Sequence, residues 1–358
     1  MPISLILSKA ANVVEVKRLI AHQLGRWLLF TDYGDNARRN MAIVWQCVGG
    51  FILVDVIWLQ ASSLSFARSN WKVCSEFLFY ITLAGAFFSL VSYRLRGKAD
   101  RVALFLRAAL QRTELLSRGC LVIGVSGTAG MVFSYLATSA AYPLTDHFLA
   151  EFDFAFGFNW PAFLKATNSN PVLASLLTHA YQSTLFVTEG VLIWLSIRGR
   201  GERLAEFLAI LNLTSVGVGL GLLIAPAAGA FAYFNPAPQL FSNFGAPGEM
   251  WSFSKVFIAL RDGSLSAIDV SVPEGIVSFP SFHTVLGIIT TYALRDDRWL
   301  MVCVLALNAI MVISTLPVGG HHLVDVLAGV AISIVAIAIV REEPAIQQTS
   351  GESSPMSA

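Results

Sequence analysis

Stretches of about twenty apolar residues alternate with short polar connections along most of this chain. A helix of that length spans the roughly 30 Å hydrocarbon core of a bilayer. The pattern therefore predicts eight membrane-spanning helices, at about residues 41–61, 74–93, 120–142, 172–196, 205–233, 276–294, 299–316 and 321–340.

The composition agrees with this pattern. The 358 residues are 55% hydrophobic and 13% charged, with a mean hydropathy of +0.66. Average soluble domains carry about 25% charged residues, so an ordinary soluble protein is excluded. We expect an all-α polytopic membrane protein. Its net charge of +1 gives no sign of a nucleic-acid partner, and we expect none.

The basic residues are distributed unevenly between the two sides that eight spans define. Both termini fall on one side, which holds most of the 24 lysine and arginine residues. The other side has Arg68, Lys72, Lys165, Lys255 and Arg261. Because positive charge collects in cytoplasmic connections, we predict an integral protein of the cell or inner membrane with both termini in the cytoplasm. The outer connections are then 62–73, 143–171, 234–275 and 317–320.

Some segments depart from the pattern of simple spans. Residues 1–40 and 100–118 place apolar and basic positions at helical spacing, which predicts helices lying on the membrane surface. The polar tail, 342–358, is predicted to be disordered. Pro226 is expected to kink the fifth span near its outer end.

A few ionisable residues lie within the predicted spans, where they are functional candidates by default. Asp55, Glu76 and Glu189 would be the relay of a transporter or channel. They are scattered along the chain, with no shared spacing. Since there is also no internal repeat of the kind found in many transporters, this reading stays an alternative.

Histidines gather at the outer ends of two spans. The stretch "FPSFHTVLG" puts His283 at the outer start of the sixth span. "GGHHLVDVLAG" puts His321 and His322 at the outer start of the eighth. The long connection between the fifth and sixth spans contains "SKVFIALRDGS", with Lys255 and Arg261. The predicted topology brings these groups to one membrane face.

His321 and Asp325 are four residues apart and so share one helix face. A carboxylate there can fix the imidazole tautomer and leave the other ring nitrogen free, as a nucleophile or base requires. His322 points about 100° away, so it is not the expected partner. The backbone amides that begin at Gly320 can approach an anion at the helix start. An ordinary buried ion pair is the competing interpretation.

These residues resemble a known family. "PSFH", followed by Ser-x6-His-x3-Asp-Val-x2-Gly, is similar to motifs two and three of the type-2 phosphatidic acid phosphatase superfamily. The details resemble its inositolphosphorylceramide synthase-like branch, a group of inositolphosphotransferases. The stretch similar to motif three is formed by Ser314, His321, Asp325, Val326 and Gly329. The likeness covers about residues 120–340, where the last six spans match the helical bundle of the family.

The resemblance implies three regions. Residues 1–118 would be an N-terminal region with interfacial helices and two extra spans. Residues 119–341 would be the six-helix catalytic domain, and 342–358 a disordered cytoplasmic tail.

The resemblance also implies roles for individual side chains. His321 would attack phosphorus and become a phosphohistidine, while Asp325 orients it and stabilises its imidazolium form. His283 would protonate the leaving group and then activate an incoming hydroxyl or water. The substrate would be a phospholipid or another lipid phosphate ester. Neither a metal nor any other cofactor is expected.

The phosphate clamp departs from the phosphatase pattern. Thr315 stands where the third motif of that branch has an arginine. Lys255 and Arg261 are one residue closer together than in its first motif, Lys-x6-Arg-Pro, and no proline follows. Arg261 is the expected phosphate ligand, because a planar guanidinium binds phosphate oxygens in pairs. Lys255, Ser281 and Gly320 are further candidates.

The arginine of the third motif and the full first motif, both lost here, are also lost in head-group transferases of the superfamily. We therefore predict a membrane-embedded lipid phosphotransferase that works through a phosphohistidine at the extracytoplasmic face. A lipid phosphate phosphatase, with water as the acceptor, is the alternative within the enzyme class. A transporter and a catalytically inactive scaffold are the alternatives outside it.

Overall fold

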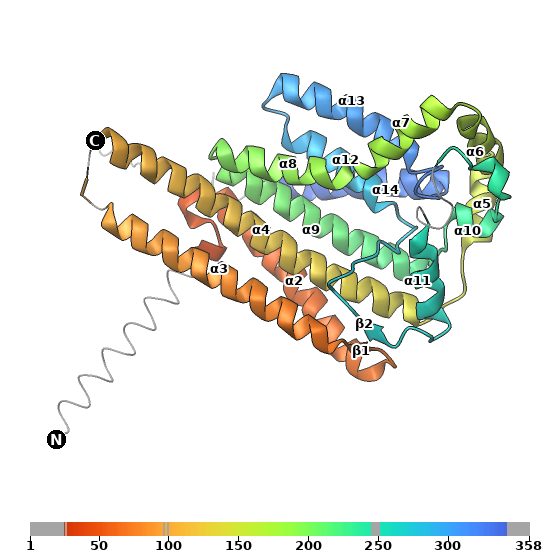
Figure 1. The fold of residues 1–358 in the computed structure, drawn as a ribbon, viewed down its shortest axis with the longest axis horizontal. Helices are drawn as coiled ribbons and strands as arrows, with labels where there is room; N and C mark the ends of the chain where they lie inside the picture. Colours follow the sequence, from red (N-terminus) through yellow and green to blue (C-terminus); the bar gives the residue numbers. More distant parts are fainter. Residues whose placement is uncertain (1–24, 26, 96, 99, 245–250, 342–358) are drawn as a thin grey trace, which may run out of the picture.

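A computed structural model describes residues 25, 27–95, 97–98, 100–244 and 251–341 (Figure 1). The part of the chain so described is helical except for two short parallel strands, β1 (Ser65–Phe66) and β2 (Ala267–Ile268). The helices are η1 (Thr31–Tyr33), α2 (Asp35–Ala61), α3 (Arg68–Arg94), α4 (Arg101–Ser139), α5 (Asp146–Ala155), α6 (Trp160–Asn168), α7 (Pro171–Gln182), α8 (Thr184–Ile197), α9 (Gly201–Ile224), α10 (Ala230–Phe234), η2 (Pro238–Leu240), α11 (Ser252–Arg261), α12 (Phe282–Ala293), α13 (Arg298–Ser314) and α14 (Leu323–Arg341).

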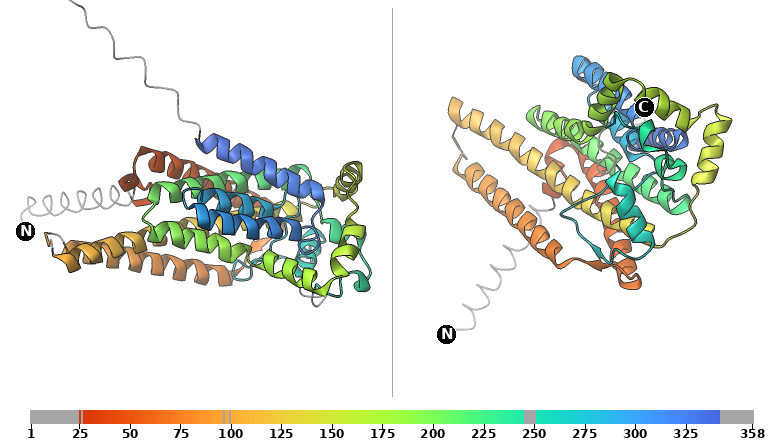
Figure 2. Two further views of the ribbon diagram at one scale, coloured as in Figure 1. Left: turned by 90° about the horizontal axis from the view of Figure 1, so that it is seen from above. Right: turned by 45° about the vertical axis from the view of Figure 1, so that its right-hand side comes forward.

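Helix α9 lies at the centre of the bundle and contacts α2, α4, α8, α12 and α14. It is apolar on nearly all sides, as a helix surrounded by others should be. Leu204, Phe207 and Leu208 are almost completely buried in its main packing surface. Helix α3 packs along α4 at the edge of the bundle, as the views of Figures 1 and 2 agree.

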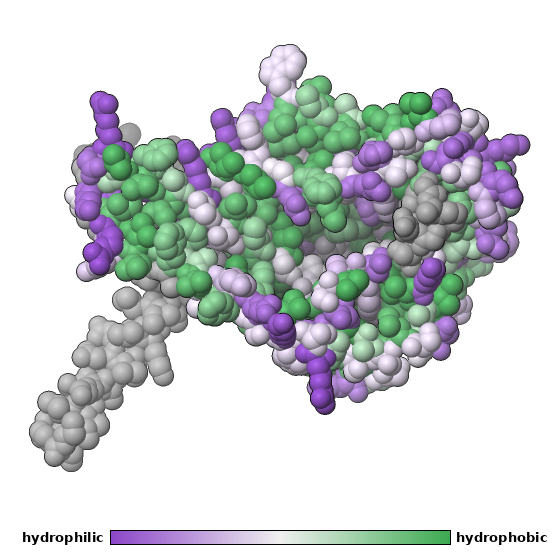
Figure 3. Space-filling model, viewed as in Figure 1, coloured by the Kyte–Doolittle hydropathy of each residue, from purple (hydrophilic) through white to green (hydrophobic). Residues whose placement is uncertain are grey.

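The prediction of an all-α membrane protein is confirmed. Four of the described helices, α2, α4, α9 and α14, are long and apolar enough to cross a membrane. Helices α8, α12 and α13 are shorter apolar helices. Large apolar side chains are exposed along the outside of the bundle, and Figure 3 shows this surface extending over the α3–α4 hairpin and α13. Such a continuous apolar exterior suits contact with lipid rather than water.

Several predicted boundaries are corrected by the structure. The segment 100–118, expected to be a separate surface helix, is the first half of the continuous helix α4. The expected domain boundary after residue 118 therefore falls inside one helix. Asp100 caps this helix by accepting from the N–H of Ala103, and no proline interrupts it before Ser139.

The fifth and eighth predicted spans also begin or end differently. Helix α9 stops at Ile224 instead of continuing through a kink at Pro226, because proline has no N–H and disfavours a helical residue before it. Helix α14 begins at Leu323, so His321 and His322 precede it. The sixth span is helical only from Phe282. Of the surface helix expected at residues 1–40, the first 24 residues lie outside the described residues, as does the tail at 342–358. Residues 35–40 are not part of a separate surface helix, because they form the start of α2.

The expected outer connections contain short helices that cover one end of the bundle. Helices α5, α6, α10 and α11 gather at that end together with β1 and β2 (Figure 1). Asn159 and Asn170 cap α6 and α7 through their side-chain oxygens, and each is followed within two residues by a proline suited to a first turn. This covered end holds the start of α14.

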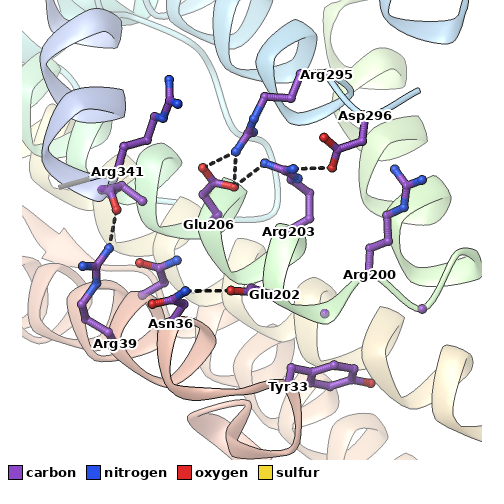
Figure 4. A pocket seen from close by; sticks show the side chains of 14 residues that line it. Tyr33, Asn36, Arg39, Arg200, Glu202, Arg203, Glu206, Arg295, Asp296 and Arg341 are labelled. Carbon is purple, nitrogen blue, oxygen red and sulfur yellow. Dashed lines mark hydrogen bonds and ion pairs between the residues drawn. The ribbon is translucent and has the colours of Figure 1, made fainter. Parts of the chain in front are cut away.

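The opposite end of the bundle carries an open cleft of about 710 Å³ with a dense charge network (Figure 4). Glu206 of α9 accepts from Arg295 at 2.6 Å and from Arg203 at 2.8 Å, and Arg203 also bonds Asp296. Arg39 of α2 donates to a backbone carbonyl at the end of α14. These bonds tie α9 to the α12–α13 turn and α2 to the end of α14.

Candidate active site

The predicted nucleophile lies on a buried turn between α13 and α14. His321 is 3% exposed, and its backbone N–H donates to the carbonyl of Thr315 at 3.2 Å. Gly320 before it has a φ of +66°, a conformation that side chains rarely adopt. A Cβ there would lie 2.7 Å from the Cβ of Phe231, so glycine is also required by space. The Gly-Gly pair thus shapes the turn that presents His321.

His321 and Asp325 meet as their spacing predicts. Nδ1 of His321 lies 3.1 Å from Oδ2 of Asp325, which belongs to the first turn of α14 and is fully buried. The same oxygen accepts from the hydroxyl of Ser278 at 3.0 Å and from the backbone N–H of His322 at 2.9 Å. Three donors therefore hold this carboxylate, and it holds the imidazole in one orientation.

The other nitrogen of His321 points towards the start of α12. Its Nε2 lies 3.5 Å from the hydroxyl of Ser281, which also caps α12. The backbone N–H of Ser281 donates to the carbonyl of Asp325 at 3.0 Å. Gly329 allows this approach, because a Cβ there would lie 2.6 Å from the carbonyl oxygen of Ser281. The two helix starts are thereby joined at the site.

His283 is held by a tyrosine that the sequence pattern does not single out. The rings of His283 and Tyr181 are stacked, with centroids 4.2 Å apart, and the tyrosine hydroxyl lies 3.5 Å from Nδ1 of His283. Tyr181 ends helix α7, about one hundred residues earlier in the chain. The contact leaves Nε2 of His283 as the nitrogen able to exchange a proton with a substrate.

The predicted phosphate ligands are only partly brought together. Ser281 and Gly320 lie at the histidines, as described above. Arg261, at the end of α11, donates to the carbonyl of Tyr142 at 2.8 Å and borders an apolar hollow of about 390 Å³. Lys255 is exposed on the same helix. Among the described residues, neither cation has a hydrogen bond or ion pair with His321, His283 or Asp325.

A second group of buried charges was missed by the sequence interpretation. Asp146 and Asp153 of α5 are 3% and 2% exposed, and both face the ring of His322. Seven residues separate the two aspartates, which places them on the same helix face. This spacing could have predicted the pair of aspartates, but only if a helix had been expected within the connection 143–171.

The surroundings of His322 alter its protonation. Burial by itself lowers the pKa of His322, but the carboxylates of Asp146 and Asp153 more than offset this and, with Asp325, raise it to about 9. Its ring is fully buried. This shift favours the protonated, positively charged form of His322, next to the histidine that is the predicted nucleophile.

The site offers a specific chemistry. His321 has one nitrogen anchored by a carboxylate and the other directed at a helix start, while His283 provides a second, separately held imidazole. This suits attack by one histidine and proton transfer by the other. Within the described residues, no group of three or more histidine, cysteine, aspartate or glutamate side chains is arranged to hold a metal ion.

The residues of the alternative relay are not brought together. Asp55 is buried in α2, whereas Glu76 is exposed on α3 beside Lys72 and Glu189 is exposed on α8. A relay needs groups within hydrogen-bonding reach of one another or of water. Among the described residues, none of these three acids forms a hydrogen bond or ion pair with another of the three.

Comparison with known proteins points to one family. The family model of the PAP2 superfamily matches residues 147–339, more than half of the chain. The match contains α6 to α13, nearly all of α5 and α14, and every residue of the two-histidine site. Searches of curated proteins and of solved structures found no match.

Proposed function

This chain belongs to the PAP2 superfamily, and from that premise we propose that it is a lipid phosphotransferase that works through a phosphohistidine. Membership supports a membrane enzyme acting on lipid phosphate esters, of the phosphatase or phosphotransferase type. More specifically, we propose that the reaction is head-group transfer similar to that of inositolphosphorylceramide synthases. The observation that carries it is the paired environment of His321, with Asp325 at Nδ1 and the start of α12 at Nε2.

In the first step, Nε2 of His321 forms a bond to phosphorus while the bond from phosphorus to the leaving oxygen breaks. His283 gives that oxygen a proton. Asp325 stabilises the positive charge that develops on His321, through the 3.1 Å contact at Nδ1. Because Asp325 is itself held by three donors, it does not need to reorganise during the reaction.

In the second step, an acceptor hydroxyl loses its proton to His283 and its oxygen bonds to phosphorus. The phosphorus–nitrogen bond then breaks and restores His321. Dividing one displacement into two lets the same pair of histidines serve both halves. With an alcohol as acceptor the protein is a transferase, and with water it is a phosphatase.

The surroundings of Thr315 favour transfer over hydrolysis. Thr315 is fully buried, its hydroxyl donates to the carbonyl of Val312 and its own carbonyl accepts from His321. An arginine at this position would bring a phosphate-binding fork beside the nucleophile, as in the phosphatase branch. Threonine instead leaves anion binding to groups outside this turn, as in the transferases that the sequence resembles.

Arg261 is the proposed contact for the substrate phosphate. Its guanidinium borders the apolar hollow formed by Leu144, Phe257 and Ile258, a combination suited to an anionic head group attached to a hydrocarbon chain. Ala228 lines the same hollow and immediately precedes Gly229, which packs against the carbonyl of Gly320. We expect Arg261→Ala to raise KM more than it lowers kcat. Lys255 is the proposed second cation.

The test uses purified protein in vesicles that contain phosphatidylinositol as donor, with and without ceramide as acceptor. New lipids are identified by mass spectrometry and free phosphate is measured separately, with a phosphatidic acid donor in a parallel sample. Wild-type turnover should be lost in His321→Ala and His283→Ala and retained in His179→Ala, whose histidine is exposed on α7. Unchanged turnover in His321→Ala would refute the phosphohistidine mechanism.

The product distinguishes the two enzyme classes. A new head-group lipid identifies a transferase, and free phosphate without a new lipid identifies a phosphatase. We further propose that both termini face the cytoplasm and that the histidines act at the outer face. Reporter fusions after Arg341 check this: a reporter active only in the cytoplasm should be active, and one active only outside should not.

A further inference from the structure

Two adjacent histidines of this protein meet different partners. The ring of His321 has one carboxylate, Asp325, at Nδ1 and a hydroxyl at Nε2, at 3.1 and 3.5 Å. The ring of His322 has carboxylates at both nitrogens: Asp153 lies 3.3 Å from Nδ1 and Asp146 lies 3.6 Å from Nε2. All of these side chains are at least nine-tenths buried.

The partners decide how many protons each ring can carry. A neutral imidazole has one N–H and one lone pair, whereas an ionised carboxylate only accepts hydrogen bonds. A neutral His322 would therefore aim a lone pair at a buried negative oxygen. It would also remove the positive charge that lies between two buried aspartates, which is costly. Only the doubly protonated ring of His322 suits both neighbours.

The two aspartates are fastened to the parts of the chain that build the active site. Asp153 accepts from the backbone N–H groups of Leu323 and Val324, both at 3.0 Å, and so caps the start of α14. It thereby holds the helix turn that contains Asp325. The negative charge at a helix start is itself favourable.

Asp146 holds a second segment against the same turn. It accepts from the backbone N–H groups of Ala228 and Gly229 at 2.9 and 2.7 Å. Gly229 packs so closely that a Cβ on it would lie 2.8 Å from the carbonyl oxygen of Gly320 and 2.9 Å from Oγ of Ser278. Ser278 in turn donates to Asp325. The His322 ring therefore sits where α5, the 228–229 turn and the α14 start meet.

We propose that His322 is a positioning residue: an imidazolium at neutral pH that clamps Asp146 and Asp153 of α5 to the turn carrying His321, and so keeps the nucleophile and its carboxylate in register. The catalytic part of this inference rests on the proposed phosphotransferase function. The clamp itself does not. Because His322 is fully buried, it acts through His321 and Asp325 rather than by contact with a substrate.

The charged and titratable groups that face His322 come from several elements. Asp146 and Asp153 of α5 contact the ring, Asp325 accepts from its backbone N–H, and Tyr233 of α10 lies 6.1 Å from it by ring centroids. Arg261 reaches this group only through its electrostatic interaction with Asp146. The acids outnumber the bases, which keeps the imidazole protonated through neutral pH.

Loss of the clamp charge should affect catalysis more than binding. The His322 backbone N–H is one of the three donors to Asp325, so a shift of this turn changes the His321–Asp325 contact directly. Misplacement of a catalytic group by about 1 Å costs on the order of 100-fold in rate. We expect His322→Gln to lower kcat by about 10- to 100-fold with KM within about twofold. In wild type, kcat should fall at alkaline pH as His322 loses its proton. This fall should be absent from the kcat profile of His322→Gln.

The first experiment measures protonation without any substrate. The full chain is labelled with 15N-histidine and purified in detergent, and the imidazole signals are followed from pH 6 to 10. The His322 signal is assigned by comparison with His322→Gln. His147→Gln is the matched control, since His147 is an exposed histidine on α5, the helix that carries Asp146 and Asp153. Two protonated nitrogens up to about pH 8 are expected for His322. A His322 signal that is neutral at pH 7 would overturn the clamp.

The second experiment tests positioning. In His322→Gln, the 15N signals of His321, which report its tautomer, should shift, kcat should fall and KM should stay. Thermal unfolding in detergent confirms that the variant is folded, and His322→Lys should recover part of the lost kcat because it restores the positive charge. Unchanged His321 signals with unchanged kcat would overturn the positioning role. If the wild-type protein turned over no lipid phosphate, the proposed function would be refuted. The His321 signals in His322→Gln would still test the clamp.

Discussion

Gly229 provides a sharp test of how the candidate active site is held, although it is about ninety residues from His321, the proposed nucleophile. Its φ of +93° and ψ of 159° lie in a region that is essentially restricted to glycine. Its N–H donates to Asp146 at 2.7 Å, so the segment cannot move away without losing that bond. Replacement by alanine therefore strains the backbone and introduces a clash.

The size of the effect can be worked out from these contacts. A residue other than glycine in this conformation costs about 1–3 kcal/mol. The new methyl group would lie 2.8 Å from the carbonyl oxygen of Gly320, a backbone atom that cannot rotate out of the way, and overpacking of this kind adds about 1–3 kcal/mol. We expect Gly229→Ala to destabilise the protein by roughly 2–6 kcal/mol in total.

The assay compares Gly229→Ala with Gly275→Ala, a loop glycine that has open space around its Cβ position. Thermal unfolding in detergent should move to lower temperature only for the first variant. If the variant is folded at the assay temperature, its kcat should also fall, because the displaced Gly320 carbonyl precedes His321. Equal unfolding temperatures for wild type and Gly229→Ala would refute this account of the packing.

Three other changes test separate parts of the structure. The raised pKa of His322 implies that its protonated form contributes about 3 kcal/mol to the free energy of unfolding, fully below pH 6.5 and progressively less as pH rises through 9. The difference in unfolding temperature between wild type and His322→Gln should therefore shrink from pH 7 to 10. Glu206→Gln weakens the charged bond to Arg295 and should destabilise the protein by about 1–3 kcal/mol, with no direct effect on the KM for lipid. Trp160→Phe leaves the buried carbonyl of Leu316 without its 2.9 Å donor, and we expect a loss of about 1–3 kcal/mol in unfolding measurements.

Local sequence was sufficient for the character of the fold. Apolar runs of bilayer length and a low share of charged residues lead to a helical membrane protein in any arrangement of the helices. The spacing of His321 and Asp325 predicted their contact, although the helical reason for it was incomplete: His321 precedes α14, and the turn before the helix brings the two side chains together. The structure confirms the fold class and gives this contact a length of 3.1 Å.

Local sequence was less reliable for the ends of helices, where a segment could either stop or continue into the next one. Residues 100–118 have the pattern of a surface helix, yet they continue without a break into α4, because nothing in the sequence interrupts that helix. Pro226 was expected to kink a long helix, but α9 ends before it. In both cases the hydrophobic pattern is the same for either outcome, so it does not locate the end of the helix.

Only the tertiary structure decided which distant groups support the histidines. Tyr181 stacks on His283 from α7, and Asp146 and Asp153 reach His322 from a helix inside a connection that hydropathy marks only as a loop. These pairs are separated by about one hundred residues or more, so no local spacing encodes them. The sequence by itself determined the helical, membrane-embedded character and the reactive motif. The packing of α5, α7, α12 and α14 determined which groups surround and orient that motif, because the partners of a buried imidazole are whichever side chains the fold places around it.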